Sequence, residues 1–328
     1  MRKLNRNDKA FIICFLGVAF VGAARFFDHT LLFHSAPMGV MQTYSFSQFA
    51  VSLYFMALLL FSVWTLKHTS DKNAKTVYYL IALWSVVALP MYLYTNYFGA
   101  MDVFAWILLI IAAFFLLEKK FEWMIIPTSF VTVCICPMAL FYSVCPMVGL
   151  LGYRAFSNPI CKKKYTRYAF LTFAVGVCGI IVAKWMQYFT TDAQMTISWH
   201  KFVIILLMLS PYAVLAFRFW EKMLAGKSFE KQIAYLSLAF AGVPAAAVTL
   251  YVQDYVRHFF TLFFYYIFVV LFLLADQNKD TEFQVQNIKG FLQKWLPMPE
   301  MVIIYPMIFF TFWVYGPLEL LEETLLGQ

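Results

Sequence analysis

The stretch FEWMIIPTSFVTVCICPMALFYSVCPMVGLLGY, residues 121–153, decides the fold, because it reads either as one long apolar helix or as two short ones. The whole chain is also strongly apolar. Of 328 residues, 63% are hydrophobic and only 13% are charged, and the mean hydropathy is +0.73. Soluble domains are about half apolar and about a quarter charged. The chain therefore has too little polar surface to cover a water-soluble globule of its size.

Similar apolar runs recur along the chain, each of roughly 16 to 21 residues, close to the length that crosses about 30 Å of hydrocarbon. The sequence predicts an all-α fold, a polytopic transmembrane helix bundle that forms a single integral membrane domain over residues 1–328. Residues 276–300 are expected to be a cytoplasmic loop with a short amphipathic helix on the membrane surface. About eleven spans are expected, over residues 10–25, 46–66, 77–95, 102–117, 121–136, 138–156, 168–188, 202–220, 232–252, 258–275 and 301–317.

The basic residues indicate the orientation, because Lys and Arg concentrate in cytoplasmic loops. With the N-terminus cytoplasmic, a single helix over 121–153 would place the cluster KKKYTR (162–167) outside, so we expect the chain to turn back near Cys136 and Pro137. The acidic tail LELLEETLLGQ then lies outside, unless the last span is re-entrant. The net charge of +8 reflects this bias and suits an anionic membrane surface, so membrane lipids and no nucleic acid are expected as partners. The basic residues left on the outer side are Arg25, Lys184, Lys201 and Arg257.

The cysteines and the short motifs exclude several kinds of site. The six cysteines lie in or beside apolar runs without metal-type spacing to His, as expected for small packing residues. A disulfide between Cys136 and Cys145 near the outer face is left open. No P-loop, GxGxxG, HExxH or CxxC pattern is present, so an ATPase, a dinucleotide enzyme and a zinc protease are unsupported.

Polar residues with catalytic character gather on the predicted outer side. Charged groups at membrane helix ends are costly if they face lipid, and they usually face a cavity or one another. On a helix, Asp254, Arg257 and His258 share one face, so the carboxylate can hold the two cations toward an anionic group. The plainer alternative is that such groups cap the helix and anchor it to lipid phosphate. The candidates are Arg25, Asp28 and His29 after the first span, Asp102 at the start of the fourth, and Asp254, Arg257 and His258 before the tenth.

Three stretches carry a resemblance to a known group: RFFDHTLLF, FGAMDVFAWILLIIAAFFLLEKKFEWMIIP and QDYVRHFF. The layout resembles that of the bacterial membrane glycosyltransferases of the C superfamily and of the O-antigen or exopolysaccharide repeat-unit polymerases. In those proteins acidic and arginine residues act at the outer face on polyprenyl-linked sugars. The third stretch is similar to an Asp-aromatic-Gly-Arg-Trp string, with Val256 in place of Gly and His258 in place of Trp.

The resemblance implies an integral membrane glycosyltransferase or polysaccharide polymerase of the bacterial plasma membrane. It would use a polyprenyl-phosphate-linked saccharide and work with partners in a polysaccharide assembly complex. Asp28 would be the base for the acceptor hydroxyl, and Arg257 and His258 would bind the leaving phosphate. No cofactor and no metal is required, although Asp28 and Asp102 could hold a metal if they meet. The implied substrate-binding residues are Arg25, His29, Asp102 and Asp254.

Two other classes of function remain as alternatives. One is a transporter or flippase for a lipid-linked or amphipathic substrate, in which the same outer charges serve as gates. The absence of an inverted repeat, and of a charged residue at a span midplane, disfavours it. The other is a non-catalytic subunit of a membrane complex.

Overall fold

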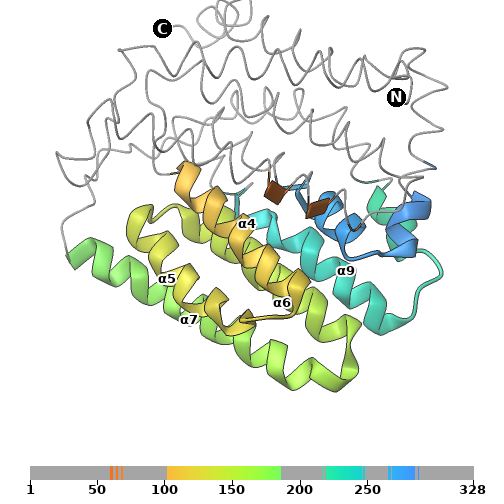
Figure 1. Ribbon diagram of the computed structural model, residues 1–328, viewed down its shortest axis with the longest axis horizontal. Helices are drawn as coiled ribbons and strands as arrows, with labels where there is room; N and C mark the ends of the chain where they lie inside the picture. The colour runs from red at the N-terminus through yellow and green to blue at the C-terminus, as the bar shows by residue number, and fades with distance from the viewer. Residues whose placement is uncertain are drawn as a thin grey trace, which may run out of the picture.

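The computed structural model describes residues 102–185, 219–245 and 268–284, together with 60, 61, 64, 65, 68, 217, 247, 265, 266 and 287. All regular structure in these residues is helical, which confirms the all-α prediction for this part of the chain (Figure 1). The longer helices are α4 (Asp102–Glu118), α5 (Ile125–Ile135), α6 (Cys145–Ser157), α7 (Lys162–Trp185) and α9 (Phe229–Ala241). Short helical turns precede three of them: η2 (Glu122–Met124), η3 (Leu140–Val144) and η4 (Pro159–Cys161).

The chain turns back between α5 and α6, as the charge placement predicts. Helix α5 ends at Ile135, and Cys136 is extended, with φ −139° and ψ 102°. The contacts with α7 show the reversal. Along α5, Ser129 donates to the Thr172 carbonyl at 2.9 Å and Val133 packs on Gly179, so α5 and α7 run parallel.

Helix α6 runs the other way along α7. Val144 packs on Gly176 near its start, whereas Phe156 near its end lies beside Thr166 of α7, with which it lines one groove. Residue numbers rise along α6 while those of the neighbouring positions on α7 fall, so α6 and α7 are antiparallel. Because α5 is parallel to α7, the chain between 121 and 153 forms two opposed helical segments rather than one.

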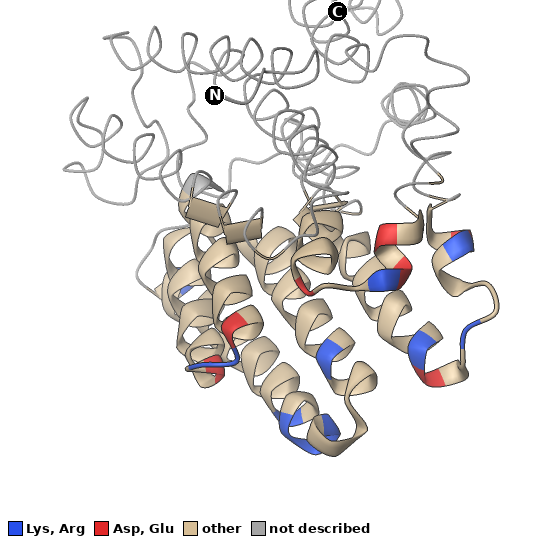
Figure 2. Ribbon diagram, turned by 45° about the vertical axis from the view of Figure 1, so that its right-hand side comes forward, with Lys and Arg blue, Asp and Glu red and all other residues tan. Residues whose placement is uncertain are grey.

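Helices α4, α5, α6 and α7 alternate in direction, and α9 runs in the same direction as α7. Helix α4 is parallel to α6, because Ser143 donates to the Ala105 carbonyl at 2.9 Å and Arg154 to the Leu116 carbonyl at 3.1 Å. Helix α9 is antiparallel to α6, since Tyr153 stacks near Tyr235 while Gly149 contacts Ala241. This alternation brings most described Lys, Arg, Asp and Glu residues to one end of the helices, here named the charged end (Figure 2).

A π-helical turn joins the reversal to α6. In η3 the backbone N–H of Cys145 donates to the Leu140 carbonyl, five residues back. Proline follows directly at position 146, and a proline both lacks an N–H and clashes with the carbonyl four residues before it. A wider turn here relieves that conflict, which accounts for a π-turn inside an otherwise regular helix.

Glycines let the helices approach closely. A Cβ at Gly149 would lie 2.4 Å from the Ala241 Cβ and 2.9 Å from the Ser237 carbonyl oxygen. One at Gly152 would lie 3.0 Å from the Ser237 Cβ, and one at Gly176 would lie 3.0 Å from Val144. Small residues at crossing points are the usual basis of helix packing in membranes, where lipid removes the hydrophobic drive for association.

Within the described ranges, one helix is long and apolar enough to cross a membrane: Pro159–Trp185, of 27 residues, which is η4 with α7. Large apolar side chains stand exposed along it, including Phe170 at 71%, Ile181 at 64% and Trp185 at 81%. Helix α4 and the η2–α5 segment are apolar but shorter. The further spans of the predicted layout stay a prediction.

The cysteine alternative is settled for this part of the chain. Cys136 and Cys145 are both free thiols, so the disulfide left open between them is not formed. The Cys136 sulfur lies 2.9 Å from the Tyr142 hydroxyl instead. The other described cysteines, Cys134, Cys161 and Cys178, are free thiols as well, in agreement with packing roles.

Candidate functional site

Of the site residues predicted from the sequence, the structure describes the position of Asp102. It is the first residue of α4, whose 17 residues place it at the end of that helix opposite Glu118. At 1.5 Å per residue the two ends are about 24 Å apart. The other predicted site residues lie outside the described residues: Arg25, Asp28, His29, Asp254, Arg257 and His258.

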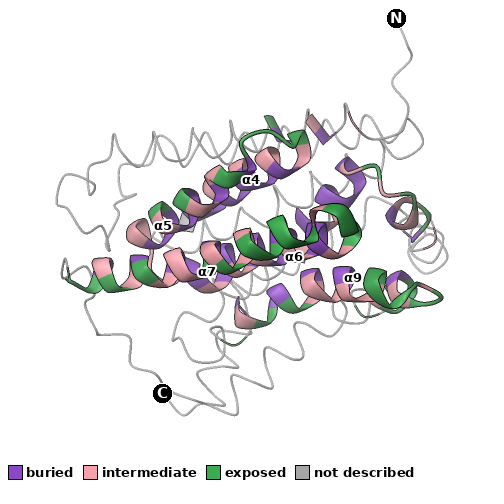
Figure 3. Ribbon diagram, turned by 90° about the horizontal axis from the view of Figure 1, so that it is seen from below, coloured by how far each residue is buried: buried purple, intermediate pink, exposed green. Residues whose placement is uncertain are grey.

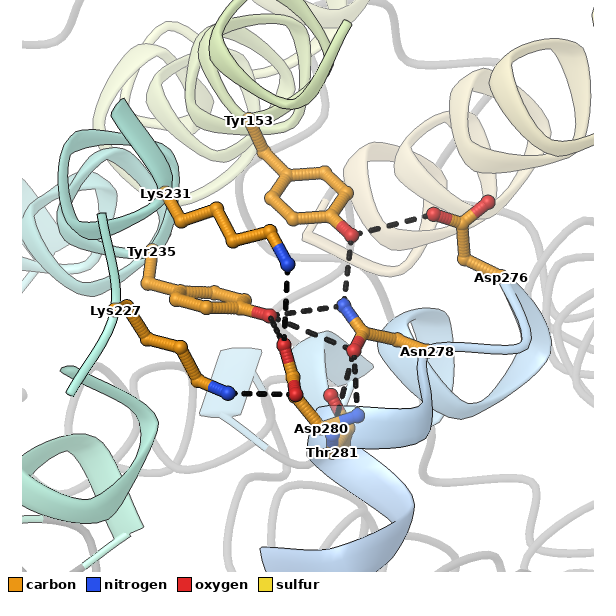
Figure 4. A network of polar contacts seen from close by, with 8 residues as sticks. All are labelled: Tyr153, Lys227, Lys231, Tyr235, Asp276, Asn278, Asp280 and Thr281. Carbon is orange, nitrogen blue, oxygen red and sulfur yellow. Dashed lines mark hydrogen bonds and ion pairs between the residues drawn. The ribbon is translucent and has the colours of Figure 1, made fainter. Parts of the chain in front are cut away.

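The described residues bring a different set of side chains together at the charged end. We refer to this set as the polar cluster, and Figure 4 shows it without Arg154. Its members come from the end of α6, from the segment that leads into α9 with the first turns of α9, and from the residues that follow the helix ending near 275. They are Tyr153, Arg154, Lys227, Lys231, Tyr235, Asp276, Asn278 and Asp280.

Arg154 joins three helix ends. Its guanidinium pairs with the Asp276 carboxylate at 2.8 Å and donates to the Leu116 carbonyl at the end of α4. The same group lies 5.9 Å from the centre of the Phe272 ring. The two charged side chains are only 11% and 18% exposed. Burial raises the pKa of Asp276 above its usual value, although the Arg154 charge and the Tyr153 hydrogen bond oppose the rise.

Asn278 is the centre of the hydrogen-bonding network. Its amide nitrogen donates to the hydroxyls of Tyr153 at 3.0 Å and Tyr235 at 3.1 Å. Its amide oxygen accepts from the backbone N–H groups of Asp280 at 3.0 Å and Thr281 at 3.4 Å. Asn278 therefore caps the helical residues 279–284 while it ties them to α6 and α9.

Asp280 binds both the segment that leads into α9 and the first turns of that helix. Its carboxylate lies 2.6 Å from the Lys227 ammonium and 3.8 Å from that of Lys231, and it accepts from the Tyr235 hydroxyl at 3.2 Å. Desolvation raises the pKa of this carboxyl, but the hydrogen bond and charge of Lys227, with the charge of Lys231, outweigh it. The pKa of Asp280 is therefore lowered, and the carboxyl stays ionised.

A second buried carboxylate lies near the same end. Glu122, only 5% exposed, accepts from the Tyr165 hydroxyl at 2.6 Å and pairs with the Lys164 ammonium. The turn before it contains two non-glycine residues with positive φ, Lys119 at 55° and Phe121 at 53°. The ion pair of Glu122 with Lys164 and its hydrogen bond from Tyr165 hold the tight connection between α4 and α5 against the start of α7.

The chemistry of these contacts is pairing rather than catalysis. Each carboxylate of the polar cluster has a cation beside it, so none is presented as a free base. Among the described residues, no group of three or more His, Cys, Asp and Glu side chains is placed to hold a metal. The arrangement closes the charged end of the bundle by cross-linking α4, α6, α9 and the segment 276–284.

Sequence reasoning placed these residues in cytoplasmic loops or near the cytoplasmic ends of spans and did not identify the cluster. A usable signal was present, because Arg154 lies inside the apolar run 138–156 and Asp276 directly follows the run 258–275. Charges at the ends of apolar helices usually pair with one another. No protein-family model, curated protein or solved structure matches this chain.

Proposed function

We propose that the chain is a polytopic protein of the bacterial plasma membrane with about eleven spans and a cytoplasmic N-terminus. The alternating directions of α4, α5, α6 and α7 support this, because a chain that crosses a bilayer repeatedly must reverse at each crossing. The gathering of basic residues at one end of these helices supports it further. That end corresponds to the cytoplasmic side under the positive-inside rule.

Within that membrane layout, the proposed activity is transfer of a saccharide from a polyprenyl-phosphate carrier at the outer face. The observation that carries it is the position of Asp102, at the end of α4 remote from the paired, closed charged end. In the proposed topology the predicted site residues share that side with Asp102. The charged groups of the polar cluster are paired with one another, so the described cluster offers no free base for the transfer.

The proposed mechanism divides the reaction between a base and a cation. Asp28 takes the proton of the acceptor hydroxyl as its oxygen attacks the anomeric carbon of the donor sugar. The bond between that carbon and the carrier phosphate oxygen breaks, and the phosphate leaves with the bonding electrons. Arg257 and His258 stabilise its negative charge. Arg25, His29, Asp102 and Asp254 orient the donor and acceptor.

The substitution Arg257→Lys tests this role. Lysine keeps the charge but loses the two parallel hydrogen bonds of a guanidinium to phosphate. A lost hydrogen bond to a charged group costs about 1.5–3 kcal/mol, or a loss of activity of roughly ten- to more than a hundredfold. Glycan output should fall by that factor at unchanged protein level, measured by gel analysis of cell-surface polysaccharide. Arg167→Lys, on an exposed residue of α7, is the matched control. Normal output from Arg257→Lys would leave only the helix-anchor interpretation.

The orientation has its own test. A reporter fused after Lys164 should lie in the cytoplasm, and one fused at Asp192 should lie outside. Lys164 lies in the first turn of α7, and Asp192 follows the last residue of α7, Trp185, in the sequence, so the two points lie on opposite sides if α7 crosses the membrane. An external signal at Lys164 would contradict the proposed orientation of every later span.

A transporter or flippase for a lipid-linked substrate is the second candidate. The closed charged end favours it, because an alternating-access protein needs a seal on one side while the other is open. Purified protein in vesicles distinguishes the two. A glycosyltransferase forms a new glycosidic bond in products extracted from the vesicles. A flippase moves a fluorescent lipid-linked oligosaccharide between leaflets without forming one.

A further inference from the structure

An apolar groove lies between α6, α7 and α9. Its volume is about 370 Å³, within the range of roughly 300–1,000 Å³ that small-molecule sites occupy. Its lining includes several small residues: Gly149, Gly152 and Ala155 on α6, Ala169 on α7 and Ala241 on α9. In Figure 3, α7 and α9 carry many exposed and half-exposed residues, whereas α6 is mostly buried.

The groove has the length of one half of a bilayer. It follows α6 from Cys145 to Phe156, which is about 16 Å at 1.5 Å per residue. Half of a hydrocarbon layer of about 30 Å is about 15 Å. The groove therefore matches the depth of a single leaflet on the side of the charged end.

A positive charge lies where the groove reaches the charged end. The Lys162 ammonium lies 5.1 Å from the centre of the Phe156 ring, which lines the groove. Lys162 and its neighbour Lys163 are both exposed, and neither forms an ion pair with a described residue. They also begin α7, where the helix dipole adds a partial positive charge. The apolar groove thus ends in a cationic site.

We propose that this groove binds an anionic glycerophospholipid of the inner leaflet, with one acyl chain between α6, α7 and α9 and the phosphate on Lys162 and Lys163. Basic pockets between helices on the cytoplasmic side are suited to such headgroups. A polyprenyl carrier fits less well, because its chain is much longer than one leaflet. The proposal rests on the membrane embedding of the chain and is independent of saccharide transfer at the outer face.

Lipid binding to the purified full chain in detergent tests the proposal, with native mass spectrometry as the readout. Phosphatidylglycerol should bind more tightly than phosphatidylcholine. The double variant Lys162→Gln, Lys163→Gln should weaken phosphatidylglycerol binding by roughly 10- to 30-fold, since each cation near an anionic surface contributes about a factor of five. It should weaken phosphatidylcholine binding much less, because the choline cation of that lipid already offsets the charge of its phosphate.

A second variant tests the groove itself. Ala169→Phe fills the space from α7 and should abolish binding of both lipids. Cys178→Phe adds a similar ring at an exposed position of the same helix outside the groove and should bind both as the wild type does. Wild-type affinity for phosphatidylglycerol in the double lysine variant would overturn the proposal. So would displacement of phosphatidylglycerol by an equal concentration of polyprenyl phosphate. Loss of glycan synthesis with lipid binding intact would bear on the outer site alone.

Discussion

The middle of α6 and its end at the charged end are held to their neighbours by different kinds of interaction. At Gly149, α6 packs closely against α9 because glycine has no side chain, and no space remains there for an added atom. At Arg154, little more than one turn later, it meets Asp276 through opposite charges that are almost removed from water. The first contact fails when an atom is added, and the second fails when a charge is removed. Two nearby positions of one helix therefore tolerate opposite kinds of substitution.

Removing the buried charge should have the largest effect. Arg154→Leu leaves the Asp276 carboxylate buried without its cation, and breaking a buried pair from one side costs about 3–5 kcal/mol of unfolding free energy. The thermal unfolding midpoint of the purified protein in detergent should fall accordingly. The double variant Arg154→Leu, Asp276→Leu removes both charges and should recover most of the loss. A single variant within about 1 kcal/mol of the wild type would contradict the buried-pair interpretation.

Adding one methyl group to the helix crossing should have the next largest effect. Gly149→Ala brings a Cβ within 2.4 Å of another Cβ, so α6 and α9 must separate. Overpacking of this kind costs about 1–3 kcal/mol. Gly152→Ala, with its nearest contact at 3.0 Å, should cost less in the same unfolding assay. The compensating change Ala241→Gly should relieve Gly149→Ala in part, and additive effects of the two would show that they do not meet.

The smallest expected effect is a pH dependence at the exposed side of the polar cluster. Because the pKa of Asp280 is lowered from 3.8, its ionised form stabilises the fold above that pH. This stability is lost as the pH falls below 3.8 through the folded-state pKa. The pair is partly exposed, so the contribution is at most about 1 kcal/mol. Asp280→Asn should flatten this part of the profile of unfolding midpoint against pH. An unchanged profile would show that Lys227 does not stabilise the carboxylate.

The parts of the fold that the sequence predicted depend on local signals. The reversal near Cys136 was predictable because a proline follows it and because the positive-inside rule puts the basic cluster after Phe156 on the same side as the earlier basic clusters. The helices themselves follow from continuous apolar runs. The π-turn over 140–144 was not predictable, because an apolar run looks the same whether its turns are regular or widened.

The polar cluster was not predicted because its partners are far apart in the sequence. Tyr153 and Asp276 are separated by 123 positions, and only the packing of α6 against the later helix brings them together. Sidedness placed both near the cytoplasmic face, which gave the right end of the bundle without the pairing. The candidate site residues on the outer side, from Arg25 to His258, also remain predictions, based only on the side of the membrane that each is expected to occupy.

The π-turn before α6 also sets an angle. Each residue of an α-helix turns the chain by about 100°, so the extra residue in Leu140–Val144 fixes the rotational phase of everything after it. Gly149 faces α9 and Arg154 faces Asp276 only in that phase. If the residues LFYSV wound as a regular α-helix, with no wider turn to take up the extra residue, both contact faces would be rotated by about 100°. In this part of the chain, the number of residues in the turn determines which way the later side chains face more than it determines the length of the helix.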